Sequence, residues 1–221
     1  MMQKLRLFII ESLNPLDMLE GRSEGAALEK ICKIFGHEVV LFQAQSRRDL
    51  NNYCDYISSI DRRGSNESPI CIHIAAHGDP DGLQFGRDYI TWDKLFVSLE
   101  PLIKNMNDYR REVLISISAC GAGRQELAAI IQSEIRSSRR FQRDFYPPEY
   151  IFVTQGSGTL DVTMWDDSAV SWTLFYHRIA KIGKRIFEAD IRGILDDIES
   201  STDTVLRSFR WNNSIRRYEK Y

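Results

Sequence analysis

Short apolar runs alternate along the chain with longer segments in which apolar residues recur every three or four positions. The first pattern is typical of buried strands and the second of helices with one buried face. Their alternation predicts a parallel sheet with right-handed crossovers and helices on both faces, which is a three-layer α/β fold. The predicted strands are Leu5–Glu11, Glu38–Gln43, the run from Ile70, the run from Val113, and Tyr150–Thr154. The predicted helices are Gly25–Phe35, Arg47–Ile60, Trp92–Ile103, Arg124–Ile135, Ser168–Ile182 and Phe187–Glu199.

Two of the predicted strands end in residues that can do chemistry. The stretch Val113–Gly123, VLISISACGAG, runs from an apolar strand into Cys120 and a glycine. The stretch Ile70–Gly78, ICIHIAAHG, has the same form and ends in His77 and Gly78. Parallel strands of an open α/β sheet present their carboxyl ends to one edge, where ligands bind. We therefore expect His77 and Cys120 to come within reach of each other.

The segments between these elements are polar or contain glycine and proline. Ser12–Arg22 and Gln155–Asp167 are predicted to be loops, Asp61–Ser68 a polar linker, and the tail from Asp203 a polar segment with scattered aromatic residues. We expect one domain over residues 1–221, with a core at about 5–186 and a C-terminal helix and polar tail over 187–221.

Composition narrows the possible classes of protein. The chain has 221 residues, of which 43% are hydrophobic, so it can build a substantial core. The net charge of −2 predicts no general attraction to nucleic acid or to anionic membranes. The apolar run Leu7–Ile10 is too short for a signal peptide or a membrane span, so we expect a cytoplasmic protein. The cysteines form no C-x-x-C pair, which argues against zinc ribbons, thioredoxin-type sites and disulfide frameworks, and no cofactor is expected. The four cysteines are Cys32, Cys54, Cys71 and Cys120.

The two strand ends together suggest nucleophilic catalysis. A cysteine reacts as the thiolate, and its pKa falls beside a histidine or at the N-terminus of a helix. Cys120 is predicted to have both neighbours, because the next helix points back at it. His77 would act as general base and would then protonate a leaving amine. The backbone N–H groups of Gly78 and Cys120 would form an oxyanion hole.

The residues at the two strand ends resemble those of the caspase-like cysteine peptidases of clan CD, and in particular the CHAT branch. The resemblance rests on His77-Gly78 after one strand and on SACGAG, Ser118–Gly123, after the next. The separation of His77 and Cys120, 43 residues, is near the roughly 50 of caspases. The caspase signature Q-A-C-[RQG]-G does not hold, because Ser118 and Ala122 replace the glutamine and the second glycine. A true caspase is therefore not expected.

Three further segments resemble CHAT domains: Ala75–Gly86, AAHGDPDGLQFG; Ile90–Leu95, ITWDKL; and Val162–Ala180, VTMWDDSAVSWTLFYHRIA. The resemblance implies a caspase-hemoglobinase fold, with Cys120 as nucleophile and His77 as base. CHAT domains often follow helical repeats. The sequence shows no such repeats, so any activation or targeting device is expected to be small or to be supplied by a partner in trans. Bacterial relatives often act in defence, including antiviral defence, or in cell death, and cleave a protein such as a gasdermin-like pore former.

Other interpretations of the same residues remain open. Cys120 could be a buried structural thiol. Cys71, His73 and His77 could hold a metal by residue type, but they lack a recognised spacing, so we predict no metal and interpret His73 as a core histidine. The segment Gly121–Gly123 lacks the third glycine of a dinucleotide fingerprint. The alternative function is a non-catalytic caspase-like module that binds a partner at its sheet edge, although retention of both His77 and Cys120 argues against it.

The two long loops are expected to select the protein substrate. Their acids would favour a basic residue before the scissile bond, with Trp165 as a wall, whereas Arg22 could instead select an acid. Exposed loop carboxylates are also often simply solvated. The arginine-rich segment Arg136–Arg143 is either a loop cut by the enzyme or a partner, or a solvated loop. The candidate substrate-binding residues are Asp17, Glu20, Asp161, Trp165 and Asp167.

Overall fold

The computed structural model describes residues 4–60, 69–103, 113–124, 127–137, 147–156, 161–182, 186, 190–202 and 204–220. The strands in these ranges are β1 (Arg6–Ser12), β2 (Glu38–Gln43), β3 (Ile70–Ala76), β4 (Gly78–Asp79), β5 (Gly82–Phe85), β6 (Asp88–Thr91), β7 (Val113–Ser118), β8 (Tyr150–Gln155), β9 (Val205–Asn212) and β10 (Arg217–Lys220). The helices are α1 (Pro15–Glu20), α2 (Glu24–Ile34), α3 (Arg47–Ile60), α4 (Trp92–Ile103), the 3₁₀ helix η1 (Ala122–Arg124), α5 (Leu127–Ser137), α7 (Trp165–Ala180) and α8 (Ile191–Glu199).

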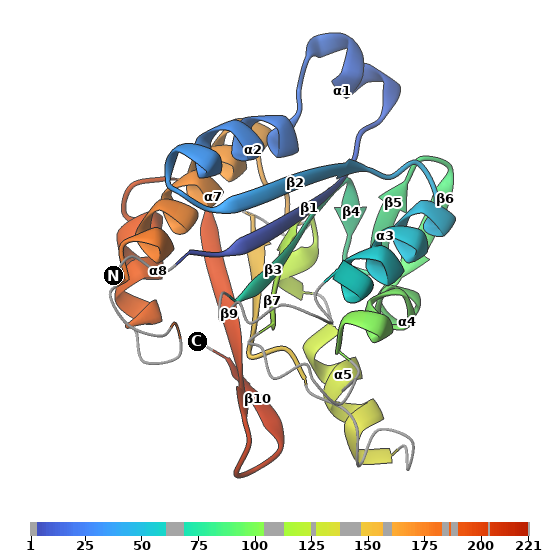
Figure 1. Ribbon diagram of the computed structural model, residues 1–221, viewed down its shortest axis with the longest axis vertical. Coiled ribbons are helices and arrows are strands. Elements are labelled where there is room, and N and C mark those ends of the chain that lie inside the picture. Colours follow the sequence, from blue (N-terminus) through green and yellow to red (C-terminus); the bar gives the residue numbers. More distant parts are fainter. Residues whose placement is uncertain are drawn as a thin grey trace.

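The main sheet is mostly parallel, as the sequence predicted. Its strand order is β10-β9-β8-β7-β3-β1-β2 (Figure 1). Strands β2, β1, β3, β7 and β8 run parallel to one another, and β9 and β10 are antiparallel to their neighbours. Because β3 and β7 are adjacent and parallel, the residues that follow them emerge at the same edge of the sheet. This adjacency brings the segments that contain His77 and Cys120 together.

Helices cover both faces of the main sheet. One core cluster contains the apolar faces of α3, α4 and α5, and the other contains those of α2, α7 and α8, so the fold has three layers (Figure 1). The strands supply both clusters through their period-two alternation. In β1, for example, Phe8 and Ile10 face the first cluster, whereas Leu7 and Ile9 face the second. The apolar runs of the sequence thus correspond to strands that are buried on both faces.

A second, three-stranded sheet, β4-β5-β6, fixes the direction of the chain after β3. Its turn is held by Asp79, whose Oδ1 accepts hydrogen bonds from the N–H groups of Asp81 and Gly82 and from the Tyr89 hydroxyl. The indole of Trp92 donates to the Pro80 carbonyl at 2.7 Å. This small sheet therefore gives His77 and Gly78 a rigid support.

Three sequence expectations need correction. The segment Ser12–Arg22 is not only a loop, because Asn14 and Asp17 form a reciprocal capping box that starts helix α1. The tail beyond Asp203 contains β9 and β10, and β9 pairs with β8, so it extends the main sheet. The end of β9, Phe209–Asn212, alternates apolar and polar residues in the sequence, which is the local signal for this strand.

The third correction concerns the helix that follows Cys120. It was expected at Arg124–Ile135, but a 3₁₀ turn comes first and α5 begins at Leu127. Its first residue is therefore further from the thiol than expected. The linker Asp61–Ser68 and residues 138–143 of the arginine-rich segment lie outside the described residues. Within the described part of the chain, no helix has the length and apolar character needed to cross a membrane.

Candidate active site

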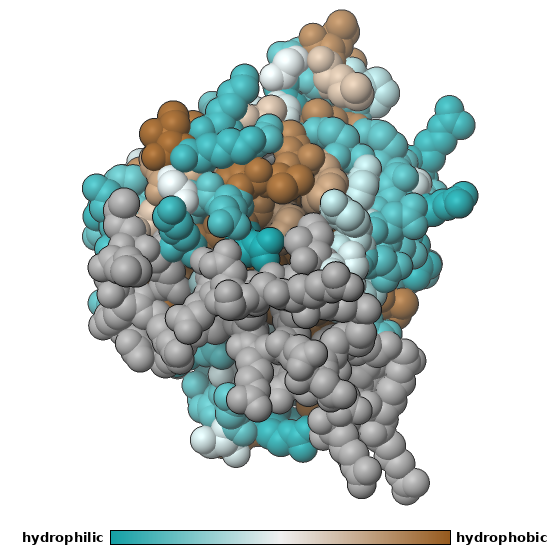
Figure 2. Space-filling model, viewed as in Figure 1, coloured by the Kyte–Doolittle hydropathy of each residue, from teal (hydrophilic) through white to brown (hydrophobic). Residues whose placement is uncertain are grey.

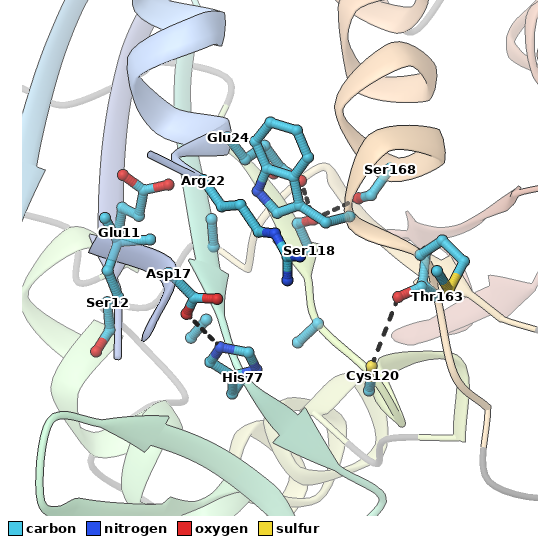
Figure 3. Close-up of a pocket in the computed structure, with 16 residues that line it drawn as sticks. Glu11, Ser12, Asp17, Arg22, Glu24, His77, Ser118, Cys120, Thr163 and Ser168 are labelled. Atoms are coloured by element: carbon cyan, nitrogen blue, oxygen red, sulfur yellow. Dashed lines mark hydrogen bonds and ion pairs between the residues drawn. The ribbon is translucent and has the colours of Figure 1, made fainter. Parts of the chain in front are cut away.

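A pocket of about 150 Å³ lies at the edge of the sheet where β1, β3 and β7 end (Figure 3). Both His77 and Cys120 line it, as their predicted positions at two strand ends required. The pocket is completed by the segment around α1 and by the segment that leads into α7. The lining residues are Glu11, Ser12, Leu13, Asp17, Arg22, Glu24, Ala75, Ala76, His77, Ser118, Ala119, Cys120, Thr163, Met164, Trp165 and Ser168.

His77 follows the last residue of β3 and is held on two sides. Its carbonyl accepts the N–H of Gln84 at 2.8 Å, which ties it to the small sheet. Its ring Nε2 lies 2.6 Å from Oδ2 of Asp17 and 2.9 Å from Nδ2 of Asn14. The imidazole remains 55% exposed, so a ligand in the pocket can reach it.

Cys120 is held by contacts of the residues on either side of it. The backbone N–H and carbonyl of Ala119 both bond to the hydroxyl of Thr154 at 3.1 Å, which secures the end of β7. Gly121 has φ +75°, and a Cβ there would lie 2.2 Å from the Asp79 carbonyl carbon, so only glycine fits. The Cys120 thiol is partly exposed and lies 3.8 Å from the Thr163 carbonyl (Figure 3). The thiol therefore faces the pocket.

Gly78 lies beside the backbone of Cys120 but is not among the residues that line the pocket. The bond from Gln84 N–H to the His77 carbonyl makes Gly78 and Leu83 a non-hydrogen-bonded pair of the β4-β5 ladder. The N–H of Gly78 is therefore not used by that ladder. A Cβ on Gly78 would lie 2.9 Å from the carbonyl oxygen of Cys120, so the two backbone segments are in close contact. The oxyanion role of the Gly78 and Cys120 N–H groups stays a prediction.

Solved structures resemble this chain in fold. A crystal structure of caspase-1 from Spodoptera frugiperda superposes with a TM-score of 0.54, at 15% sequence identity, over 89% of this chain and 75% of that one. The fold is caspase-like. The structure of pro-sf-caspase-1 matches with a TM-score of 0.50 at 13% identity, over 89% of this chain and 79% of that one. No protein-family model and no curated protein matches the sequence. At these identities the likeness shows the caspase-like fold alone.

The structure separates the five candidate substrate-binding residues. Asp17 and Trp165 line the pocket of this caspase-like fold, but Asp17 is engaged with His77. Glu20 lies outside the pocket lining and forms an ion pair with Arg22 at 2.7 Å. Asp161 is buried beside the turn that follows Cys120, where its carbonyl accepts the Gly121 N–H and its carboxylate accepts the Gly156 N–H. Asp167 belongs to the first turn of α7 and does not line the pocket.

A buried polar network, which includes His73, forms part of the pocket wall and extends into the core. Glu24, the first residue of α2, accepts hydrogen bonds from the His73 ring and the Ser118 hydroxyl, each at 2.8 Å. Ser118 also lies 2.7 Å from the Ser168 hydroxyl, and the other nitrogen of His73 bonds to Tyr176. His73 is thus a satisfied core histidine, as predicted. No local signal marked Glu24, because its partners come from β3 and β7.

Charged and ligating residues in the described ranges do not form a metal site. No group of three or more His, Cys, Asp or Glu side chains there has a metal-binding arrangement. Cys71 lies 3.6 Å from the hydroxyls of Ser116 and Tyr176 rather than beside His77. The pocket contains the Cys120 thiol and the His77 imidazole.

The four thiols are expected to differ sharply in reactivity. Burial raises the pKa of Cys32 to about 12 and that of Cys71 to about 11, and burial also raises the pKa of Cys54. Cys120 is the partly exposed thiol and lines the pocket. Treatment of the native protein with iodoacetamide at pH 8 should modify Cys120 well before the others, and peptide mapping will show which thiol has reacted. Equal labelling of all four thiols would contradict this assignment.

Proposed function

We propose that this protein is a cysteine endopeptidase that cleaves a protein substrate. The observation that carries the proposal is that His77 and Cys120, which follow adjacent parallel strands of a caspase-like fold, line one pocket. Nucleophilic catalysis needs a nucleophile and a base that can meet in one site, and a thiol and an imidazole that line the same pocket support this. The free N–H expected at Gly78 beside Cys120 supports the same chemistry.

The proposed reaction uses each of these groups in turn. His77 takes the proton from the Cys120 thiol, and the thiolate attacks the carbonyl carbon of the scissile peptide bond. The oxyanion that forms lies against the backbone N–H groups of Gly78 and Cys120. The imidazolium gives its proton to the leaving nitrogen, the C–N bond breaks and a thioester remains. Water then loses a proton to His77 and attacks the thioester, which releases the acid and restores the thiol.

The charges around the pocket favour an acidic residue before the scissile bond. Glu11 and Glu24 line the pocket, but their carboxylates already accept hydrogen bonds from neighbouring groups. Asp17 is likewise held against His77. Arg22 lines the pocket with its side chain 55% exposed, and its partner Glu20 is itself 45% exposed. A weakly held surface ion pair can be exchanged for a ligand carboxylate.

The wider setting of this activity is proposed from the motifs. The segments Ala75–Gly86 and Val162–Ala180 support placement in the CHAT branch. Membership of that branch would fit a cytoplasmic enzyme in bacterial antiviral defence or cell death, switched on by a partner in trans and acting on a gasdermin-like protein. The alternative is a caspase-like interaction module without activity. Retention of both a thiol and an imidazole in one pocket favours the enzyme.

Cleavage of a mixed peptide library, read by mass spectrometry, tests the proposal. We expect the wild-type protein to cut after aspartate or glutamate, and the Cys120→Ala variant to make none of these cuts. A Cys54→Ala variant is the matched control, because that thiol is buried away from the pocket, in the core. Cuts that persist in Cys120→Ala would contradict the proposal. A silent wild type whose Cys120 also shows no preferential alkylation would establish the interaction module.

A further inference from the structure

Helix α1 is unusual because its apolar side chains point away from the protein. Leu16, Met18 and Leu19 are between 63% and 83% exposed, and Asp17 is the one residue of this helix that is buried. Figure 1 shows α1 standing clear of the sheet, and Figure 2 shows apolar side chains at its tip. Burial of apolar surface therefore does not explain the position of this helix. Its inward contacts are polar and lead to His77.

The contact between Asp17 and His77 is short and sheltered. Oδ2 of Asp17 lies 2.6 Å from Nε2 of His77, and the Asp17 side chain is 12% exposed. The capping box fixes the carboxylate further, since Oδ2 also accepts the Asn14 N–H at 3.2 Å. Asn14 caps the helix through Oδ1, which accepts the N–H groups of Leu16 and Asp17. The side chain at position 17 is thus held in place before any substrate binds.

This contact decides which nitrogen of His77 carries the hydrogen. Nε2 of His77 has two close neighbours, the Asp17 carboxylate at 2.6 Å and the side-chain amide nitrogen of Asn14 at 2.9 Å. The carboxylate can only accept a hydrogen bond and the amide nitrogen can only donate one, so Nε2 can bond to one of them. The contact with Asp17 is the shorter one and involves a charged group, which favours donation from Nε2 to Asp17. The neutral ring then has its lone pair on Nδ1, and Figure 3 shows this second nitrogen on the side of the ring toward Cys120. The ring nitrogen on the side toward Cys120 is therefore the one with a lone pair that can accept a proton. When the ring becomes an imidazolium, the adjacent carboxylate also balances its charge.

We propose that Asp17 is a positioning residue that holds His77 in the tautomer and orientation needed to deprotonate Cys120. The inference rests on the proposed function for the role of His77 as base. It replaces the earlier assignment of Asp17 to substrate binding. This role also accounts for helix α1, which adds little to the hydrophobic core but presents Asp17 to the imidazole of His77.

The Asp17→Asn variant tests this role. Its side-chain amide can donate to Nε2, which would move the hydrogen of the ring to Nδ1 and leave the thiol without an acceptor. We expect the rate of Cys120 alkylation by iodoacetamide at pH 7 to fall about tenfold. Glu29→Gln is the matched control, since Glu29 is a carboxylate of α2 that pairs with Lys33 and does not line the pocket, and the alkylation rate of this variant should equal that of the wild type.

Nitrogen NMR of the histidine side chains gives a second measurement that does not depend on peptidase activity. The protein has four histidines, and the His77 signals are those missing from a His77→Ala spectrum. We expect hydrogen on Nε2 in the wild type and on Nδ1 in Asp17→Asn. A wild-type ring with hydrogen on Nδ1, or an unchanged alkylation rate in Asp17→Asn, would overturn the inference. Absence of peptide cleavage together with the expected tautomer would count against the peptidase alone.

Discussion

A His77→Ala variant is expected to hydrolyse peptides about 10³-fold more slowly than the wild-type protein. In the proposed mechanism His77 serves twice, first as the base for the Cys120 thiol and then as the acid for the leaving nitrogen. Both steps need an imidazole in the pocket, and His77 is the histidine that lines it. The effect is measured as the initial rate on the peptide that the library identifies as the best substrate, at equal enzyme concentration.

The control for this experiment is His177→Ala. His177 lies on α7, packs against Phe35 and does not line the pocket. Its replacement should leave the rate within about twofold of wild type, because surface substitutions away from a site usually have small effects. A His77→Ala protein that keeps more than about a tenth of the wild-type rate would show that another group is the base.

The Glu24→Ala variant is expected to lose a large part of its free energy of unfolding. Glu24 and His73 form a buried pair with side chains 6% and 0% exposed, and Ser118 donates to the same carboxylate. Removing the carboxylate leaves the His73 ring nitrogen without its partner in the core. Leaving a buried polar group without its partner in this way costs about 1–3 kcal/mol of the free energy of unfolding. Urea denaturation followed by circular dichroism measures the change.

The matched control lies on the same helix. Glu29 pairs with Lys33 one turn away, at 2.8 Å on the exposed side of α2. Glu29→Ala should cost no more than about 0.5 kcal/mol, because exposed pairs one helical turn apart contribute little. If Glu24→Ala and Glu29→Ala destabilise the protein equally, the buried network does not hold the floor of the pocket as the structure indicates.

The sequence alone predicted most of the caspase-like core. Apolar runs and helical periodicity located β1, β2, β3, β7 and β8 and the helices between them, because these signals are local and repeat over whole elements. It also placed His77 and Cys120 at one edge, since residues that follow parallel strands must emerge together. Trp165 and Arg22 were recognised as residues near the pocket for the same reason, from loops that leave that edge.

Only the tertiary structure decided what Asp17 and Glu24 do. Asp17 belongs to a six-residue helix, which is too short to show periodicity, and its partner His77 is 60 residues away. Glu24 begins a regular helix, but its partners come from β3 and β7. The spacing of apolar residues along a segment indicates which face of that helix or strand is apolar. It does not indicate which polar groups from different elements contact each other, because those contacts depend on how strands and helices pack in three dimensions.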